Sequence, residues 1–359
     1  MADYATLTPL NIVTGFLGSG KTTLLQRLLR APQLGQVAVL VNEFGEVGLD
    51  HHLLQAVAET TLLLENGCVC CAIRGDLQQA LRDLLSRRAR GQVPPFVRVV
   101  IETSGLADPV PIAYTLLAEP VIRHHFRLSN IVTTVDAVNG LAQLDRFPEA
   151  KKQAAVADRL VLTKADLADP EQVRTLSVTL RRLNAAASLV EPAAIGPDGE
   201  QLLADDIYDA DGKRREIGRW LAVDGVGADG VGADGVGADH VEADAVGHDH
   251  AGDVQCFALT FDRPLDWGAF GIWSTMLLHR HGADVLRMKG LLHVAGVSTP
   301  VLINGVQHLV HPPSHLEAWP DGDRRSRLVF IVRGIPRAAI ERSLNAFNAL
   351  VNSRPSVPA

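Results

Sequence analysis

The sequence GFLGSGKT at residues 15–22 decides the fold class of this chain. It matches the pattern G-x-x-x-x-G-K-[ST], in which glycines let backbone N–H groups turn inward around nucleotide phosphates. An apolar stretch at residues 10–14 precedes it, and an amphipathic stretch from residue 23 follows it. Phosphate binding at a helix N-terminus requires this strand–loop–helix order. We therefore predict a P-loop whose nucleotide contacts come from Gly15, Gly18, Ser19, Gly20, Lys21, Thr22 and Thr23.

Two P-loop residues have predicted tasks of their own. We expect the Lys21 ammonium to reach the β- and γ-phosphates and the Thr22 hydroxyl to bind Mg²⁺. A second strand end delivers Glu102-Thr103-Ser104-Gly105. A carboxylate at such a place contacts Mg²⁺, usually through water, so we predict Glu102 there. Gly105 could offer its N–H to the γ-phosphate and make this loop respond to hydrolysis. The alternative for Glu102 is an exposed loop carboxylate without a role in binding Mg²⁺.

A third motif follows another apolar strand. Thr163-Lys164-Ala165-Asp166 resembles the guanine-reading N-K-x-D, with Thr in place of the first Asn. In that motif the Asp accepts hydrogen bonds from N1 and the 2-amino group of guanine. Adenine lacks this pair of donors, so a buried Asp discriminates against it. We therefore predict that Thr163, Lys164 and Asp166 bind the base of GTP.

The order of elements predicts an α/β fold for the first 200 residues. Apolar β-branched runs alternate there with amphipathic segments such as Leu77–Arg90, as in a mainly parallel sheet covered on both faces. Polar residues gather just after each run, at the edge where open α/β sheets bind ligands. The runs that we expect to be strands are Leu10–Thr14, Val37–Asn42, Val97–Glu102, Ile131–Asp136 and Leu160–Thr163.

The composition changes after residue 222. Residues 223–253 contain three tandem Gly-Val-Gly-Ala-Asp repeats and no aromatic residue, which predicts a disordered acidic linker rich in Gly, Ala, Asp and His. The order of elements beyond it, β-α-β-β-β-α, predicts a smaller α+β domain. We thus expect a P-loop domain at 1–222, the linker at 223–253 and a C-terminal domain at 254–359. Its expected elements are Val254–Phe261, Trp267–His281, Val285–Val294, Val301–Val310, Arg327–Val332 and Pro336–Asn348.

The stretch GCVCC at residues 67–71 holds three of the four cysteines. Adjacent cysteines are awkward to join to each other, so metal binding explains them better than a disulfide. In an extended backbone Cys68 and Cys70 share a face and Cys71 points away, so convergence requires a bend. Three thiolates suit Zn²⁺, Co²⁺ or Cu⁺ and leave a coordination position open. A buried cysteine cluster without metal is the alternative.

Between the P-loop and the cysteines lies Asn42-Glu43-Phe44-Gly45-Glu46. A first switch loop would occupy this place in a GTPase. Glu43 or Glu46 could orient water, reach Mg²⁺ or supply a further metal ligand, and the sequence does not choose among these roles. A solvated loop is the alternative for either residue.

Charge and hydropathy exclude several classes of protein. The net charge is −7, but residues 224–253 carry seven Asp and one Glu without Lys or Arg, so the rest of the chain sums to +1. A near-neutral body gives no support for nucleic-acid binding. No apolar run reaches the length of about 18 residues that a membrane span needs. The N-terminus lacks the features of an export signal, so we expect a cytoplasmic protein with no membrane partner.

Taken together, the motifs resemble the CobW family of metal-chaperone GTPases. The stretches that carry the resemblance are GFLGSGKTT (15–23), NEFGEVGLD (42–50), GCVCC (67–71), ETSGLADP (102–109), TKAD (163–166), RMKG (287–290) and LVFIVRG (328–334). The resemblance implies a SIMIBI-class GTPase that binds Zn²⁺ or Co²⁺ at Cys68, Cys70 and Cys71. It also implies coupling of GTP turnover to metal delivery to a client metalloprotein.

Other functions stay open at this stage. Within the family, zinc allocation and cobalt delivery for cobalamin synthesis share these motifs. A zinc buffer with nucleotide-regulated capacity is a further alternative. The sequence does not fix the oligomeric state, and a homodimer is one candidate. A small-molecule kinase would share the P-loop and would leave the cysteines unexplained.

Overall fold

The computed structural model describes residues 6–30, 36–41, 61–65, 73–190, 201–204, 213, 217–218, 220 and 254–352. The chain divides into two units, residues 1–216 and 217–359, and each is described by itself. Within the described ranges, every helix is too short or too polar to cross a membrane.

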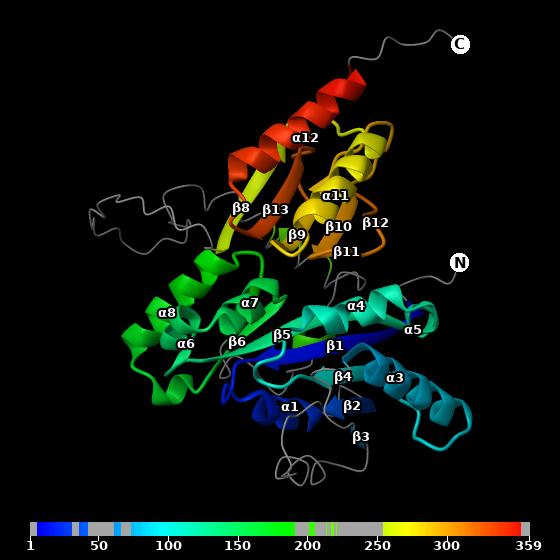
Figure 1. Ribbon diagram of the computed structural model, residues 1–359, viewed down its shortest axis with the longest axis vertical. Helices are drawn as coiled ribbons and strands as arrows, with labels where there is room; N and C mark the ends of the chain where they lie inside the picture. Colours follow the sequence, from blue (N-terminus) through cyan, green and yellow to red (C-terminus); the bar gives the residue numbers. More distant parts are fainter. Residues whose placement is uncertain are drawn as a thin grey trace. The chain divides into compact units, whose positions relative to one another are not determined.

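The first unit is built on a parallel sheet with the strand order β3-β2-β4-β1-β5-β6-β7 (Figure 1). Every neighbouring pair in it runs in the same direction, which confirms the predicted parallel sheet. β1 lies between β4 and β5, so the P-loop leaves the middle of the sheet. The strands are β1 (Thr8–Gly15), β2 (Val37–Val41), β3 (Thr61–Glu65), β4 (Arg98–Glu102), β5 (Phe126–Asp136), β6 (Arg159–Thr163) and β7 (Ser188–Val190).

Helices bury both faces of this sheet, as its unbroken apolar strands predict. On one face the leucines of α1 pack against Val13 and Val100. On the other face α6, α7 and α8 cover Val135 and Leu160. The helices of this unit are α1 (Lys21–Leu29), α3 (Ile73–Ala89), α4 (Val110–Ala118), α5 (Pro120–His125), α6 (Gly140–Arg146), α7 (Pro148–Val156), α8 (Pro170–Leu183) and α9 (Gln201–Ala204).

The sequence does not predict β3 and β7, which form the two edges of the sheet. An edge strand has one neighbour, and β7 has only three residues, all half-buried, so it carries no clear alternation or apolar run. The sequence also places the start of β5 too late, since the strand begins at Phe126 and all eleven of its residues are buried. The polar residues Ser129 and Asn130 interrupt the apolar pattern, so the first part of β5 is not recognised as strand from the sequence.

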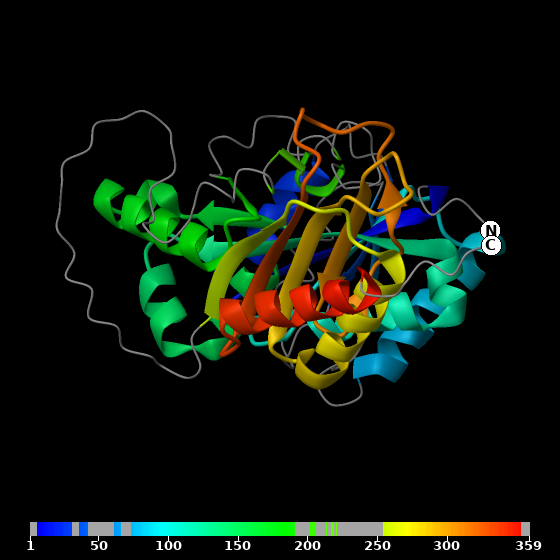
Figure 2. The same ribbon diagram turned by 90° about the horizontal axis from the view of Figure 1, so that it is seen from above.

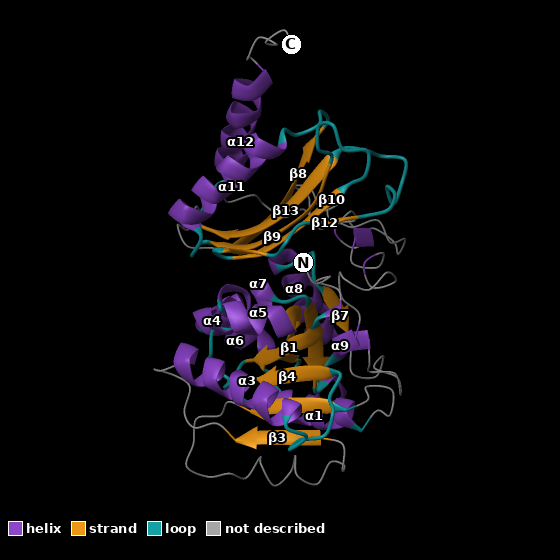
Figure 3. Ribbon diagram, turned by 90° about the vertical axis from the view of Figure 1, so that its right-hand side faces the viewer, coloured by secondary structure: helices purple, strands orange, loops and turns teal. Residues whose placement is uncertain are grey.

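The second unit is an antiparallel sheet with both of its long helices on one face (Figures 2 and 3). The strand order is β11-β10-β9-β13-β8, with β12 paired to β10. The core between sheet and helices includes Trp273 of α11, whose Nε1 donates to Ser343 Oγ of α12 at 2.9 Å. Its elements are β8 (Val254–Phe261), α11 (Trp267–His281), β9 (Val285–Leu292), β10 (Val301–Val306), β11 (Leu309–Val310), β12 (Ser314–His315), β13 (Ser326–Arg333) and α12 (Arg337–Asn352).

One predicted strand of this unit is wrong. Residues 301–310 are not a single strand, because the chain reverses at Gln307, where φ is 51°, and β11 folds back on β10. The turn contains Gln-His and none of the Gly, Asn or Asp signals by which hairpin turns are recognised. The apolar residues on both sides therefore look continuous in the sequence.

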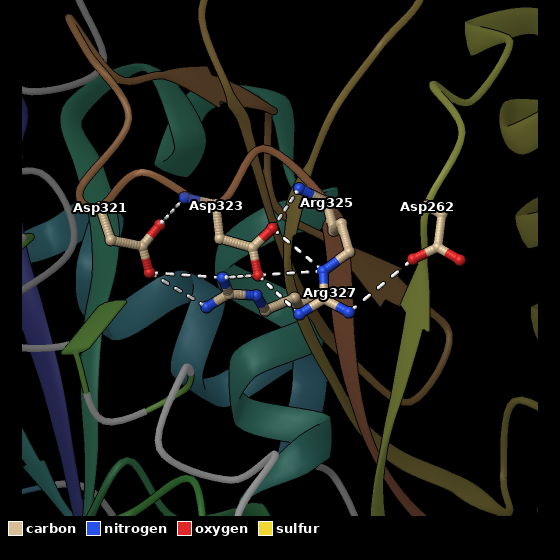
Figure 4. A network of polar contacts seen from close by, with 5 residues as sticks. All are labelled: Asp262, Asp321, Asp323, Arg325 and Arg327. Atoms are coloured by element: carbon tan, nitrogen blue, oxygen red, sulfur yellow. Dashed lines mark hydrogen bonds and ion pairs between the residues drawn. The ribbon is translucent and has the colours of Figure 1, made fainter.

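An ion-pair network holds the chain before β13 in place (Figure 4). The Asp323 carboxylate accepts from Arg325 Nε at 3.0 Å and Nη2 at 2.8 Å, and it pairs with Arg327 Nη2 at 2.5 Å. Arg327 also pairs with Asp321 at 3.3 Å. Hydrogen bonds from the Arg325 side chain hold the pKa of Asp323 well below its usual range. Asp323 therefore stays ionised and keeps both guanidinium groups paired.

We expect Asp323→Asn to lower the free energy of unfolding by about 2 kcal/mol at pH 7, the size found for hydrogen bonds to charged groups. Asp262→Asn is the matched control, because Asp262 is 86% exposed and meets Arg325 only at 3.7 Å. Urea unfolding of both variants measures the difference. Equal stability of the two variants would contradict a structural role for the network.

Candidate nucleotide site

The P-loop has the backbone that phosphate binding requires. Gly15, Gly18 and Gly20 have φ values of 144°, 70° and 86°, which favour glycine. A Cβ on Gly15 would lie 2.3 Å from Thr134 Oγ1, so this glycine also lets the loop approach β5. Gly20 is the N-cap of α1, and the loop therefore ends at the positive end of that helix.

Two side-chain hydrogen bonds tie the P-loop to neighbouring strands. Ser19 Oγ lies 2.6 Å from Thr134 Oγ1 of β5. Thr163 Oγ1, at the end of β6, donates to the Ser19 carbonyl oxygen at 2.7 Å. Thr163 was predicted to bind the base; within the described residues its hydroxyl contacts P-loop backbone, and also Val135 O at 3.2 Å. Thr163, which replaces the Asn of the motif, thus binds the end of β6 to the P-loop.

The predicted Lys21, Thr22 and Glu102 come together at the start of α1. Lys21 Nζ donates to the carbonyl oxygens of Gly15 and Phe16 at 3.1 and 3.2 Å. Thr22 Oγ1 donates to Glu102 Oε1 at 2.6 Å, and Glu102 is buried. A hydroxyl and a carboxylate oxygen at this distance form the hard donor set that Mg²⁺ prefers, so the residues fit that ion. Thr23 is exposed on α1.

The loop at residues 103–109 lies directly on the P-loop. A Cβ on Gly105 would lie 2.7 Å from both Cα and N of Leu17, so only glycine allows this approach. Thr103 anchors the start of the loop: its N–H donates to Val13 O at 2.9 Å and its Oγ1 to Thr14 Oγ1 at 2.8 Å. Gly105 is thereby fixed beside the P-loop, where the sequence predicted a γ-phosphate contact.

The predicted base motif is held by a residue that the sequence did not single out. Lys164, with φ 56°, donates from Nζ to Asp136 Oδ2 at 2.8 Å. Asp136 also accepts from Val138 N at 2.8 Å and from Asn139 Nδ2 at 3.1 Å. Burial acts to raise the pKa of Asp136, but these hydrogen bonds, led by that from Lys164, outweigh it and hold the pKa below its ordinary value. Asp166 is exposed in the 3-10 turn η3 (Ala165–Leu167) that follows.

Three residues of the site, Thr134, Asp136 and Gln153, were missed by sequence reasoning. Asp136 carried a usable signal, since it is the last residue of an apolar strand, where ligand-binding side chains gather. Thr134 and Gln153 carried none, because their partners are 115 and 48 residues away in the chain.

The other predicted site residues, Glu43, Glu46, Cys68, Cys70 and Cys71, lie outside the described residues. The strands before them are described: β2 ends at Val41 and β3 at Glu65. Val41 is in register with both Glu65 and Glu102, so these three residues end neighbouring parallel strands at one edge. In the part of the chain that is described, no group of three or more His, Cys, Asp or Glu is placed to hold a metal.

Comparison with known proteins decides the family. Residues 9–191 match the domain described as CobW/HypB/UreG, nucleotide-binding domain, and residues 254–348 match the Cobalamin synthesis protein cobW C-terminal domain. The chain belongs to the CobW family. This confirms the resemblance drawn from the motifs, and with it the GTPase class of the protein.

Full-length relatives support this membership in the CobW family. The chain is 31% identical over 329 residues to the Zinc chaperone YjiA of Escherichia coli (strain K12), across 92% of this chain and 95% of that one. It is 29% identical to the Zinc chaperone CobW of Pseudomonas aeruginosa, across 94% and 90%. The crystal structure of Zn(II)-bound YjiA GTPase from E. coli matches with a TM-score of 0.66 at 27% identity, across 95% and 99%. The predicted fold is confirmed by this likeness.

We expect Asp136→Asn to lower the free energy of unfolding at pH 7 by about 2 kcal/mol, because an amide N–H would face buried donors. The folded-state pKa of Asp136 is lowered, so its contribution is present above about pH 4, the ordinary pKa of the carboxyl, and is lost as the pH falls further. Urea unfolding between pH 3 and pH 7 measures this. The exposed Asp145→Asn is the control; a loss of stability in Asp136→Asn that is equal at all pH values would contradict the assignment.

Proposed function

We propose that this CobW-family GTPase binds Zn²⁺ at Cys68, Cys70 and Cys71 and couples GTP hydrolysis to transfer of the metal to a client metalloprotein. The observation that carries the proposal is the shared register of Glu65, Val41 and Glu102. Neighbouring strands lie about 4.8 Å apart, so the end of β3, three residues before Cys68 in the chain, lies about 10 Å from the end of β4, which carries Glu102.

In the proposed nucleotide site each residue has one task. Lys21 neutralises charge on the β- and γ-phosphates, and Thr22 and Glu102 hold Mg²⁺, which shields the same charge. Gly105 offers its N–H to the γ-phosphate, and Asp166 accepts from the guanine edge. Glu43 orients the attacking water. The support is the Lys21–Gly15 and Thr22–Glu102 hydrogen bonds, which gather these groups at the start of α1.

In the proposed metal site three thiolates bind the cargo, with Glu46 as a candidate further ligand. Thiolates favour Zn²⁺ over the hard ion Mg²⁺, so the two metals separate between the two sites. The names of relatives, Zinc chaperone and Zinc-regulated GTPase metalloprotein activator, favour Zn²⁺ over Co²⁺ as cargo and a metalloprotein as client. Cobalt delivery for cobalamin synthesis is the alternative cargo, and a zinc buffer the alternative use.

The proposed organisation assigns the two activities to one domain. Residues 1–222 bind both the nucleotide and the metal. Residues 223–253 are the linker to the C-terminal domain, which residues 254–359 form. The remaining parts of the proposal are action in the cytoplasm without nucleic acid or membrane as partners, and a homodimer as an oligomeric state to be tested.

Cysteine replacement tests the metal site. We expect wild-type protein purified without chelator to hold one equivalent of Zn²⁺, and Cys70→Ala to lose tight binding because two thiolates remain. Cys256→Ala is the matched control: Cys256 lies on β8 of the second unit and should leave the metal content unchanged. Metal analysis of the three proteins gives the stoichiometry. Stoichiometric zinc retained in Cys70→Ala would move the site elsewhere.

A further inference from the structure

Helix α7 contacts both loops of the nucleotide site. Phe147, the N-cap of α7, stacks on Phe16 of the P-loop with ring centroids 4.7 Å apart. Within the helix, Gln153 Nε2 donates to Gly105 O at 3.1 Å and to Ala107 O at 2.9 Å. One helix thus touches the P-loop through its N-cap and the 103–109 loop through a residue in its C-terminal half.

The chemistry of Gln153 suits this place. Both acceptors are backbone carbonyls, so the –NH₂ end of the amide must face them, and a neutral amide supplies two donors there without burying a charge. Gln153 is 1% exposed. The backbone carbonyl oxygen of Gln153 accepts from Thr133 Oγ1 of β5 at 3.0 Å, which fixes the helix to the sheet. The backbone of α7 is therefore fixed to the sheet at the residue whose side-chain amide binds the loop.

A second attachment lies one residue earlier on α7. Lys152 Nζ pairs with Asp108 Oδ2 at 2.5 Å, and the two side chains are 24% and 35% exposed. Asp108 Oδ1 in turn accepts from Val110 N at 3.0 Å, at the start of α4. The far end of the 103–109 loop is thereby joined to α7 as well.

The packing of Gly105 leaves no room for a side chain at this position. Gly105 lies so close to Leu17 that a single added carbon would overlap the P-loop backbone. A shift of the loop by a fraction of an ångström would therefore change the distance between its N–H groups and the phosphates. Misplacement by about 1 Å costs about a hundredfold in rate.

We infer that Gln153 is a positioning residue for GTP hydrolysis: through its two hydrogen bonds it holds Gly105 against the P-loop, where the γ-phosphate is bound. The inference rests on the proposed role of Gly105. It predicts an effect on turnover larger than the effect on nucleotide binding, because the P-loop contacts of Lys21 and Ser19 do not pass through Gln153.

Gln153→Met tests this, because it keeps the length of the side chain and removes both hydrogen bonds. We expect kcat for GTP to fall by about tenfold or more, with KM for GTP and Kd for GDP changed by less than about threefold. A purely structural role would lower stability and leave this split between kcat and KM absent. Steady-state kinetics and GDP titration measure it.

Asn184→Leu is the matched control. Asn184 is 1% exposed, and its Nδ2 donates to the carbonyl oxygens of Ala154, Ala155 and Ala157 at 3.0, 3.1 and 3.0 Å. It is thus a buried amide that, like Gln153, binds backbone carbonyls, but its Nδ2 donates to the C-terminal end of α7 and not to either loop. We expect this variant to lose stability and keep kcat within about twofold of the wild type.

A kcat within twofold of the wild type in folded Gln153→Met, or an equal loss of kcat in Asn184→Leu, would overturn the inference. If Gln153→Met does not fold, Gln153→Leu decides, since it also removes both hydrogen bonds and has a smaller side chain: kcat should fall with KM unchanged, and an unchanged kcat overturns the inference. Lys21→Ala separates the two proposals. If Lys21→Ala still hydrolyses GTP, the proposed nucleotide site is contradicted. If Lys21→Ala loses hydrolysis but Gln153→Met keeps the wild-type kcat, only the role of Gln153 is contradicted.

Discussion

The parallel register of β1 with β4 and β5 is the constraint on which the site depends. It pairs Val13 with Glu102 on one side and Gly15 with Thr134 on the other. Because parallel strands end at the same edge, each strand delivers its last polar residue to the P-loop. The hydrogen bond between Thr22 and Glu102, whose residues are 80 apart in the chain, forms only in this register.

The loops at this edge are bound to one another and do not behave as separate parts. Thr163 of β6 holds Ser19, Gln153 of α7 holds Gly105, and Gly105 rests on Leu17. A change in the phosphate contacts therefore has packed neighbours through which to act. The same edge carries the ends of β2 and β3, after which the segments with Glu43 and the cysteines begin. The proposed coupling of GTP and metal rests on this shared edge.

Much of the nucleotide site could be predicted from the sequence because its determinants are local. The P-loop concentrates the residues of one function in eight positions, and Glu102 directly follows an apolar run. Asp136 also ends an apolar strand and offered the same kind of signal, although its partner Lys164 is known only once β5 and β6 pack together. Gln153 could not be assigned in this way, since its role exists only once α7 packs against the 103–109 loop. The sequence did not predict the edge strands β3 and β7 or the turn at Gln307 for a related reason. Tertiary contacts, and not local propensity, decide whether these elements form. The cysteine site stays a prediction.

The difference in Zn²⁺ affinity between nucleotide states tests the central claim most directly. Competition with a chromogenic chelator gives the affinity of the protein loaded with Mg²⁺ and either GDP or a non-hydrolysable GTP analogue. The account predicts that the two affinities differ by about tenfold or more, a coupling free energy of about 1.4 kcal/mol, and that Cys70→Ala abolishes the difference. Equal affinities in the two nucleotide states, with GTP turnover unchanged by zinc or client, would contradict it.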